Sequence, residues 1–412
     1  MSVELKMAWR NIWRNPRRTV LTICAIAFAA FLLVFMLSFQ FGSYETMIDT
    51  SVKMSTGHLK VYSNGWLENK EMRHSIDDPE AVGHLLASIP GIKAWSFRSS
   101  GFSLISSTER TCGVLVTGIN PETETGVSTI RSLIRKGHYL EPIDRNQVIV
   151  GGLLATNLKV DIGGELTIMG QGKDGSVAAA VVQVKGIFES GMDEFDRNAI
   201  MLGQRDFNEI FSMNGSVHEV VILAESLRAV SQIKKDIGIA LESVSKEELL
   251  SVSDWMEIMP GLLQSIQMDL VSGIIMYLIL VIVVAFSIFN TFVMAVFERT
   301  REFGVMMAIG TTPGRLTKLV LYESACMTAV GIFSGIVGGC LITLWFQKHG
   351  VYIAGSAEIM SQYGLPERLY PKLTLITAVT GPFAVFLITI ISAVFPAMKI
   401  RRLNPVEAMH HV

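Results

Sequence analysis

Three short stretches carry residue types that could bind phosphate, calcium or a transition metal. The stretch from Gly170 to Asp174 combines two glycines with Lys173, as a phosphate-binding loop does. However, Thr167 stands where the first glycine of such a loop belongs, and Asp174 stands where a serine or threonine would hold magnesium. The sequence therefore predicts a hairpin turn here rather than a nucleotide site.

The acidic residues Asp193, Glu194 and Asp196 could bind calcium, but they lack the alternating ligands and following glutamate of a calcium loop. We interpret them as a solvated turn. The eight histidines show no metal-ligand spacing, and His410 and His411 are typical of a disordered tail. Neither a nucleophile with its base nor a nucleotide loop is found, so the sequence predicts no catalytic residues, no metal site and no enzyme.

Composition indicates a membrane protein instead. Half of the 412 residues are hydrophobic, only 17% are charged, and the mean hydropathy of +0.42 is too high for a soluble chain of this length. A bilayer core of about 30 Å needs roughly 20 apolar residues in a helix. Four stretches without Asp, Glu, Lys or Arg meet this requirement, namely Val20–Phe41, Leu270–Phe297, Ala325–Gln347 and Leu373–Met398.

The first apolar stretch, Val20–Phe41, is too long for a cleaved signal peptide, whose apolar region has roughly 7 to 15 residues. It also lacks a small-residue cleavage site at Phe39–Phe41, so we expect a retained anchor. The net charge of −2 gives no reason to expect nucleic acid as a partner. Proton-coupled transport is disfavoured because the four stretches contain no carboxylate or lysine.

Basic residues near the apolar stretches predict the orientation, because cytoplasmic loops carry excess Lys and Arg. They gather before the first stretch, between the second and third, and after the fourth, as Lys6, Arg10, Arg14, Arg17, Arg18, Arg299, Arg301, Arg315, Lys318, Lys399, Arg401 and Arg402. We therefore expect both termini in the cytoplasm and the long segment from Ser43 to Asp269 outside. Cys112 is the only cysteine in that segment, which excludes a disulfide within it.

The long outer segment mixes short β-branched runs with helical periodicity, which predicts an α+β domain. Expected strands are Gly57–Tyr62, Cys112–Thr117, Gln147–Val150, Glu165–Met169, Val181–Val184 and Glu219–Leu223, and expected helices are Pro79–Ser88, Leu153–Leu158, Gln204–Phe211 and Leu227–Leu241. Apolar residues at helical spacing from Trp255 to Leu270, through the single Pro260, predict a stalk helix that leads to the second span. The first span is expected to extend likewise through Tyr44, Met47 and Ile48.

The predicted fold class is thus a membrane α-helical protein with four transmembrane helices and a large α+β extracytoplasmic domain between helices 1 and 2. The expected order is an interfacial helix (1–18), span one (19–42), the outer domain with stalk helices (43–269), span two (270–297), a cytoplasmic coupling loop (298–318), span three (319–347), a short outer loop (348–372), span four (373–398) and a cytoplasmic tail (399–412).

The first 18 residues predict an amphipathic helix in the membrane interface, because Trp9 and Trp13 lie one turn apart opposite a basic face. An ordinary juxtamembrane flank is the alternative. Asn15 and Pro16 are expected to separate this helix from the first span. In the connection Glu298–Arg315, Gly310 is expected to end one short helix, and Thr312 to cap a second one that begins at Pro313. The result is an exposed helical edge that suits docking to a partner.

This connection closely resembles the E-R-T-R-E-x-G-x-x-x-A-x-G signature of FtsX-like ABC transporter permeases, the group with the MacB-type and the lipoprotein-releasing LolC/LolE-type subunits. The resemblance spans the chain. It continues at Trp9, Arg10, Asn11, Ile12, Arg14 and Pro16, at Val150, Gly151, Leu154, Ala155, Leu158, Val160, Gly163 and Gly164, at Val184, Gly186, Ile187, Phe188, Ser190, Gly191 and Asp196, and at Pro396, Ala397, Leu403, Pro405, Val406, Glu407 and Ala408. One departure is Glu165, where the family often has Asp after the glycine pair.

The resemblance implies a permease in the bacterial inner membrane that pairs with a second permease copy or paralogue and with a cytoplasmic ABC ATPase dimer. ATP and Mg would be bound by that ATPase and no cofactor by this chain. ATPase closure would move the outer domains through the stalk helices. In lipoprotein-releasing relatives this extrudes an acylated protein from the outer leaflet toward a periplasmic carrier.

Two sets of site residues follow as hypotheses. Coupling to the ATPase is expected at Glu298, Arg299, Arg301, Glu302, Gly310 and Arg315. The alternative is a positive-inside loop with surface ion pairs, each worth about 0 to 1 kcal/mol. A cavity for lipid chains is expected at Phe35, Met36, Phe39, Met259, Leu263, Ile266 and Met268, because methionine and aromatic walls suit varied apolar guests. Plain helix packing or lipid contact is the alternative there.

The leading functional hypothesis is ATP-driven extraction of lipoproteins or other amphiphiles. MacB-like export of peptides or small molecules with a periplasmic adaptor is a second hypothesis. The third is FtsX-like mechanotransmission to a periplasmic effector without transport, which predicts no apolar guest in the membrane cavity.

Overall fold

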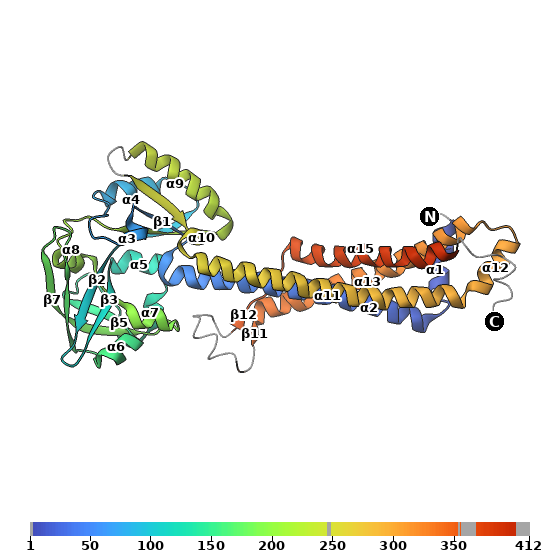
Figure 1. Cartoon of the computed structure of the whole chain (residues 1–412), viewed down its shortest axis with the longest axis horizontal. Coiled ribbons are helices and arrows are strands. Elements are labelled where there is room, and N and C mark those ends of the chain that lie inside the picture. The colour runs from blue at the N-terminus through green and yellow to red at the C-terminus, as the bar shows by residue number, and fades with distance from the viewer. Residues whose placement is uncertain (1–2, 245–248, 353–354, 356–367, 401–412) are drawn as a thin grey trace. The chain divides into compact units, whose positions relative to one another are not determined.

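The computed structural model describes residues 3–244, 249–352, 355 and 368–400. The chain divides into two compact units (Figure 1). A helical unit contains the residues up to Thr46, Ser265–Tyr352 and the chain from Arg368 onward, and a sheet unit is built on Met47–Gln264. The predicted tail motif from Leu403 to Ala408 and the pair His410 and His411 lie outside the described residues.

Four long apolar helices could each cross a membrane, and the sheet unit follows the first of them, which confirms the predicted fold class. They are α2 (Pro16–Ser51), α11 (Pro260–Glu298), α13 (Pro313–His349) and α15 (Leu375–Ile400). The shorter elements are α1 (Val3–Ile12), α12 (Thr300–Ala308), β11 (Val351–Tyr352) and β12 (Arg368–Leu369). The expected extension of the first span through Tyr44, Met47 and Ile48 is confirmed.

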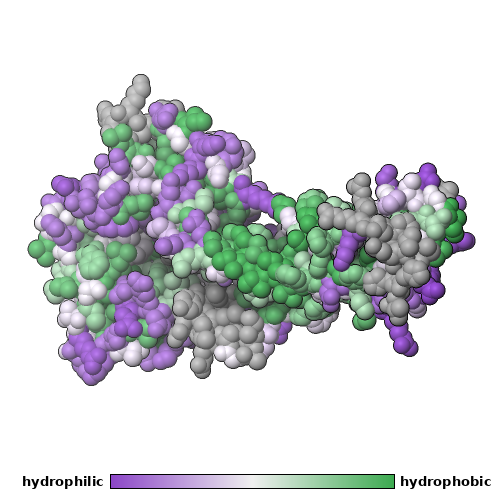
Figure 2. Space-filling view, turned by 45° about the vertical axis from the view of Figure 1, so that its right-hand side comes forward, coloured by the Kyte–Doolittle hydropathy of each residue, from purple (hydrophilic) through white to green (hydrophobic). Residues whose placement is uncertain are grey.

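Glycines allow α13 and α15 to approach α2 closely. A Cβ atom added at Gly335 of α13 would lie 2.4 Å from the carbonyl oxygen of Ala27, and one at Gly381 of α15 would lie 2.6 Å from Cβ of Leu33. Small residues at such positions let membrane helices pack backbone against backbone. Apolar side chains still cover much of the outer surface of the helices (Figure 2), as expected of a protein surrounded by lipid.

The stalk helix expected through Pro260 is interrupted. Helix α10 (Trp255–Ile258) ends before Met259, whose φ of −122° and ψ of 63° are not helical, and α11 begins at Pro260. Proline disfavours a helical conformation in the preceding residue and lacks a backbone N–H, so it begins a helix more readily than it continues one. The prediction of one continuous helix was therefore wrong, because the helix is interrupted at Met259.

Among the described residues, the sheet unit has a sheet of ten strands and several short helices. The strands are β1 (Leu59–Ser63), β2 (Ile92–Ser106), β3 (Thr111–Ile119), β4 (Ile134–Gly137), β5 (Gln147–Gly151), β6 (Glu165–Gln171), β7 (Val177–Phe188), β8 (Ala199–Gly203), β9 (Glu219–Ala224) and β10 (Leu250–Asp254). The helices are α3 (Trp66–Asn69), α4 (Pro79–Ala87), α5 (Pro121–Val127), α6 (Gly152–Leu158), α7 (Asp193–Asn198), α8 (Gln204–Ile210), α9 (Val230–Val244) and α10, with a π-helical turn at Val52–Thr56 and 3-10 turns at Ile130–Leu133 and Leu227–Ala229.

The strands pair in the order β10-β1-β9-β2-β3-β8-β5-β7-β4, and β6 pairs with both β2 and β7. The pairing of β6 closes β2, β3, β8, β5, β7 and β6 into a ring. Its interior holds one hydrophobic core, into which Leu154 of α6, Phe207 of α8 and Phe211, the residue directly after α8, also pack. All six predicted strands and all four predicted helices are present, with ends shifted by a few residues and Leu227–Ala229 as a 3-10 turn.

The longest strand, β2, was missed. Its middle reads Ser96, Phe97, Arg98, Ser99, Ser100 and Gly101, which is typical of a loop, yet most of these residues are buried. Arg98 is tolerated inside because Glu124 of α5 accepts two hydrogen bonds from its guanidinium. A buried ion pair between distant segments leaves no local signal in the sequence.

Two interpretations of polar stretches have different outcomes. The predicted hairpin turn is confirmed, because residues 172–176 connect the antiparallel strands β6 and β7. The solvated turn at Asp193, Glu194 and Asp196 is confirmed only in part: Asp193 and Glu194 are exposed, but the three residues lie in α7 and Asp196 is buried. Both carboxylate oxygens of Asp196 accept hydrogen bonds from the backbone N–H of Ser190, so this side chain ties a loop to the helix.

Another buried ion pair, between Lys60 and Glu219, joins β1 to β9. Lys60 donates hydrogen bonds of 2.8 and 3.0 Å to the carboxylate of Glu219. Burial alone would raise the pKa of Glu219, but Lys60, Lys70 and Arg98 outweigh it and hold the pKa at about 2.

Neighbouring His218 stacks on Trp66 with ring centroids 4.0 Å apart. Burial lowers the pKa of His218 to about 4.

Candidate functional site

Helix α12 is the short helix of the predicted coupling loop. It ends where Gly310 adopts a φ of +105°, a value that favours glycine, and the backbone N–H groups of Gly310 and Thr311 bond back to Met307 and Met306. The expected end of this helix at Gly310 is confirmed. Thr312 stands before Pro313 as expected, but its side chain makes no capping hydrogen bond, and the second helix of the pair is the beginning of α13 itself.

One face of α12 is built into the helical unit. Phe303 is fully buried, and Gly304 is buried beside it. Phe303 belongs to a core cluster with Val296 of α11, Leu316 and Val320 of α13, and Ala397 and Ile400 of α15. This cluster joins α12 to three membrane helices, so the helix has a defined seat.

The other face of α12 is exposed and partly apolar. Val305 is 44% exposed, and Ile309, the residue directly after α12, is 82% exposed. Arg301 and Arg315, which flank these residues in the chain, are also exposed, as is Gly310. An exposed apolar surface with basic neighbours is the kind of surface that a protein partner covers.

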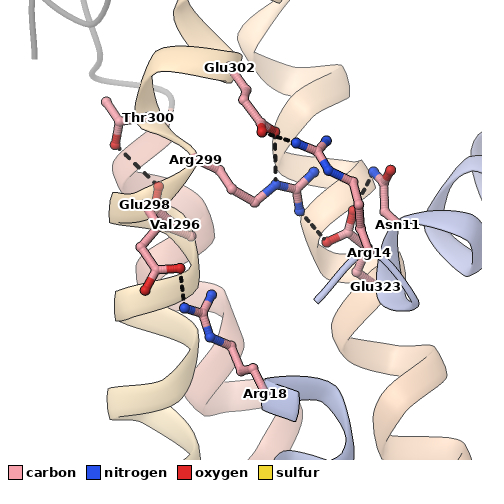
Figure 3. Close-up of polar contacts among 9 residues, drawn as sticks. All are labelled: Asn11, Arg14, Arg18, Val296, Glu298, Arg299, Thr300, Glu302 and Glu323. Atoms are coloured by element: carbon pink, nitrogen blue, oxygen red, sulfur yellow. Dashed lines mark hydrogen bonds and ion pairs between the residues drawn. The ribbon is translucent and has the colours of Figure 1, made fainter. Parts of the chain in front are cut away.

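Ion pairs surround the start of α12 and join it and the end of α11 to neighbouring segments (Figure 3). Arg14, between α1 and α2, pairs with Glu302, and Arg18 of α2 pairs with Glu298 of α11. Arg299, directly before α12, donates to Glu302 over 3.3 Å and to Glu323 of α13 over 2.8 Å. The guanidinium of Arg299 also lies over the ring of Phe303, 5.3 Å from its centroid.

Glu323 is the most buried member of this network. Its residue surface is 8% exposed, and each carboxylate oxygen has one partner. Oε1 accepts a hydrogen bond of 2.7 Å from the side-chain amide of Asn11 in α1, and Oε2 accepts the one from Arg299. A cavity of about 300 Å³ adjoins the network and is lined by Asn11, Arg14, Arg18, Glu298, Arg299, Glu302 and Glu323 among others.

The six predicted coupling residues therefore fall into two groups. Arg301, Gly310 and Arg315 lie on the exposed surface. Glu298, Arg299 and Glu302 form ion pairs within the chain. Their role in coupling stays a prediction. Sequence reasoning missed Asn11, Arg14, Arg18 and Glu323 as their partners. A signal existed for Glu323, because it is a carboxylate two residues before the uncharged stretch that begins at Ala325.

Helix α1 packs against α13 through a face that includes the buried Ala8 and Ile12. Trp9 and Trp13 lie on the exposed side, with ring centroids 6.3 Å apart. The predicted break before the first span is confirmed, because α1 ends at Ile12 and α2 begins at Pro16. Contact of the two tryptophans with a membrane interface stays a prediction.

The residues predicted to line a lipid-chain cavity lie in both units. In the helical unit, Phe35 stacks on Phe39 and also contacts Phe346 of α13, with centroids 6.2 and 5.6 Å apart. Met36 and Ile266 are half-buried, and Met268 is exposed. In the sheet unit, Met259 accepts a hydrogen bond from Thr56 over 3.5 Å, and Leu263 is half-buried. Their role as cavity walls stays a prediction.

Near these residues, a polar cluster joins α2 to α11 within the helical unit. Tyr44 donates a 2.6 Å hydrogen bond to Asp269, and Tyr277 donates a 2.7 Å hydrogen bond to the amide oxygen of Gln40. The amide nitrogen of Gln40 lies 3.1 Å from the same Asp269 oxygen. Gly273 leaves room for Gln40, because a Cβ atom there would lie 2.5 Å from its nitrogen.

Family comparisons agree with this architecture. The family described as FtsX-like permease C-terminal matches residues 274–405, which contain α12 and most of the helical unit. The family described as MacB-like periplasmic core domain matches residues 19–239, more than half of the chain. The chain belongs to the FtsX-like permeases with a MacB-like periplasmic core. The family resemblance predicted from the coupling loop is thereby confirmed.

Three relatives have nearly the same sequence identity to the permease. The lipoprotein-releasing system transmembrane protein LolC of Xylella fastidiosa is 24% identical over 408 residues, which cover 95% of the permease and 93% of LolC. The pyoverdine export ATP-binding/permease protein PvdT of Pseudomonas putida is 25% identical over an alignment 440 residues long, gaps included, and this alignment covers 98% of the permease and 59% of PvdT. The ABC transporter permease YtrF of Bacillus subtilis is 24% identical over 373 residues, which cover 80% of each chain.

The protein is thus an ABC transporter permease of the FtsX, MacB and LolC type and a multi-pass inner-membrane protein. Permeases of this type work with cytoplasmic ATPase partners.

Proposed function

We propose that this permease extracts lipoproteins or similar amphiphiles from the outer leaflet of the inner membrane and delivers them toward a periplasmic carrier. A separate cytoplasmic ATPase dimer binds ATP and Mg and drives the cycle, and a second permease copy or paralogue completes the complex. The likeness to LolC, which extends over nearly the full length of both chains, supports this choice of cargo.

The observation that carries the proposal is the two-faced α12. Its buried face is anchored by Phe303 in the core cluster of three membrane helices, while Val305 on its other face and Ile309 directly after the helix are exposed. A helix that is fixed on one side and exposed on the other can receive a push from a docked partner and pass it to the membrane helices. We place the ATPase on the exposed face, with Arg301 and Arg315 at its rim.

This docking requires α12 and both termini to lie in the cytoplasm. The orientation is supported by the basic residues of the α11–α13 connection and of the segment before α2, such as Arg14, Arg17 and Arg301. The sheet unit then lies in the periplasm, where the cargo and its carrier would meet it.

A second candidate is export of a peptide or small molecule, with a periplasmic adaptor. The likeness to PvdT, which covers 98% of the permease, favours it. Mechanotransmission to a periplasmic effector without cargo is a third reading of the same architecture. The three differ in what the complex binds, so the bound material discriminates between them.

The docking surface is tested with the permease purified together with its neighbouring ATPase. Ile309→Asp should reduce the amount of ATPase that copurifies at least about tenfold, because the charge would be desolvated in the interface. Ile143→Asp is the matched control, since Ile143 is 83% exposed in the sheet unit. Equal ATPase recovery with Ile309→Asp and wild type would remove α12 as the docking site.

The cargo is tested by placing a photo-crosslinking amino acid at Phe39 and at the exposed Phe333 of α13 as a control. The complex is illuminated in native membranes without nucleotide, and the adducts are identified by mass spectrometry. Adducts of an acylated lipoprotein at position 39 alone support extraction. Adducts of a peptide or small molecule favour export, and lipid alone at both positions would favour mechanotransmission.

A further inference from the structure

The carboxylate of Glu323 joins three elements of the helical unit. Its partners are Asn11 in α1, at 2.7 Å, and Arg299, directly before α12, at 2.8 Å, while Glu323 itself lies in α13 (Figure 3). Both oxygens are used, and the residue is 8% exposed. A rotation of α12 about its axis therefore has to break these buried hydrogen bonds or move Glu323 and Asn11 along with the helix.

The other ion pairs around α12 are much more accessible to water. The side chains of Arg14 and Glu302 are 60% and 36% exposed, and those of Arg18 and Glu298 are 26% and 40% exposed. The corresponding values for Arg299 and Glu323 are 16% and 10%. Water screens exposed pairs, which contribute little to geometry, whereas a buried pair strongly penalises arrangements that separate its charges.

Arg299 also connects the buried pair to the rest of α12. Its guanidinium reaches Glu302, one turn into the helix, and covers the ring of Phe303. An apolar residue at position 323 could fill the same volume, but it could not fix the direction of this guanidinium. Phe303 thus holds α12 against the membrane helices by packing, and the charge of Glu323 in addition fixes the orientation of α12.

We propose that Glu323 is a positioning residue for ATPase coupling, which acts through Arg299 to fix the orientation of α12 on the helical unit. The proposal rests on the proposed docking of an ATPase to α12. In this proposal, Glu323 itself contacts neither the ATPase nor the cargo. With α12 fixed in orientation, a force on its exposed face moves the membrane helices; without this constraint, the same force only tilts α12.

The orientation of α12 is measured first on the permease alone. Spin labels are attached to cysteines at Ala308, the last residue of α12, and Phe333, both exposed, after the four native cysteines are replaced by alanine. Labelled protein is diluted with unlabelled protein so that only distances within one chain contribute. We expect Glu323→Gln to broaden the distance distribution, and Glu298→Gln, the same change in an exposed pair, to leave it unchanged.

The double variant Arg299→Gln/Glu323→Gln separates the role of the pair from a folding defect. It leaves no unpaired buried charge, and the two amides can bond to each other, so it should be less disturbed than Glu323→Gln alone. In the complex with ATPase, cargo-stimulated ATP turnover should fall about fivefold or more in Glu323→Gln and recover in the double variant. ATPase copurification should stay within about twofold of wild type in both.

An unchanged distance distribution in Glu323→Gln would overturn the proposal. So would a broadened distribution with full cargo stimulation, because Glu323 would then serve only to hold the structure together. If wild-type permease bound no ATPase, the docking proposal would fail, and the distance measurement would still decide whether Glu323 orients α12.

Discussion

Arg98 of β2 and Glu124 of α5 form a two-pronged ion pair inside the sheet unit. Nε and Nη2 of Arg98 lie 3.1 and 2.5 Å from the two carboxylate oxygens, and the side chains are 5% and 0% exposed. The arginine comes from the serine-rich stretch that resembles a loop. The pair therefore replaces the hydrophobic contacts that a strand interior normally supplies.

Loss of one member of this pair should destabilise the sheet unit strongly. Glu124→Gln removes the carboxylate that accepts two hydrogen bonds from the buried guanidinium of Arg98, at a cost of about 3 to 5 kcal/mol. The unfolding midpoint of the sheet unit, followed by tryptophan fluorescence of the purified permease, should fall by about 10 °C. Lys159→Gln breaks the exposed pair with Glu109 and should change the midpoint by about 2 °C or less. Equal shifts in the two variants would contradict this account.

The stability of the sheet unit should decline as the pH falls from 6.5 toward 4. Burial lowers the pKa of His218 to about 4 from an ordinary 6.5, so the unfolded chain binds a proton in this range that the folded chain refuses. The backbone N–H of Ser100 donates to Nδ1, and Nε2 lies 3.2 Å from the carbonyl of Met72, so the neutral ring is the form with both partners satisfied. The stability present above pH 6.5 is lost on acidification, by about 3 kcal/mol.

His218→Gln tests this window, because a glutamine amide can accept from one partner and donate to the other without titrating. Unfolding midpoints from pH 7.5 to 4.5 should then decline less steeply than in the wild type. Burial lowers the pKa of His58 as well, so His58 should contribute to the slope that remains. His138→Gln, at an exposed position, should reproduce the wild-type slope. An unaltered slope in His218→Gln would assign the decline to other groups.

Close packing of α13 on α2 predicts a sharp difference between two neighbouring glycines. Gly335→Ala places a methyl group 2.4 Å from the backbone oxygen of Ala27, and neither helix backbone can yield without separating the pair. Gly338→Ala places it 3.6 Å from the ring of Phe31, an ordinary contact. Thermal aggregation followed by size-exclusion chromatography should show a midpoint lowered by several degrees for Gly335→Ala alone. Similar midpoints would mean that the helices are not packed this closely.

The polar cluster between α2 and α11 predicts that Tyr44→Phe destabilises the helical unit. The hydroxyl of Tyr44 is the nearest donor to Asp269, and its loss should cost about 1 to 3 kcal/mol. The midpoint in detergent should fall measurably, while Tyr322→Phe, at an exposed position, should leave it within error. Under the proposed function, Tyr44→Phe should also increase cargo crosslinking at Phe39, since α2 and α11 would separate more easily. A stable variant with unchanged crosslinking would argue against entry between these helices.

Much of this architecture could be predicted from one sequence because its signals are local. Four long uncharged stretches are unambiguous, and Gly310 with Pro313 determines the end of one helix and the beginning of the next. Strands such as Glu165–Gln171 follow from alternation of apolar and polar residues over adjacent positions. Each of these signals lies within one continuous stretch of the chain.

The parts that could not be predicted depend on partners in other helices and strands, whose positions the local pattern does not give. Arg98 and Glu323 are charged residues whose burial requires Glu124 in one case and Arg299 and Asn11 in the other. In the sequence, Arg299 and Glu302 are typical of a displayed basic-acidic loop, and the structure shows them in ion pairs within the chain. The break at Met259 was missed because the apolar spacing continues through it, although Pro260 should have outweighed the spacing.

The first and last strands of the sheet unit, β1 and β10, are antiparallel neighbours, and Leu59 pairs with Asp254. The chain therefore enters and leaves this domain at adjacent backbone positions, although nearly 200 residues separate them. An insert whose two ends meet can be removed or exchanged without forcing its host to open a gap. The sheet unit is in this sense a modular insertion. Evolution, or an engineer, could replace it with another domain and keep the same membrane helices.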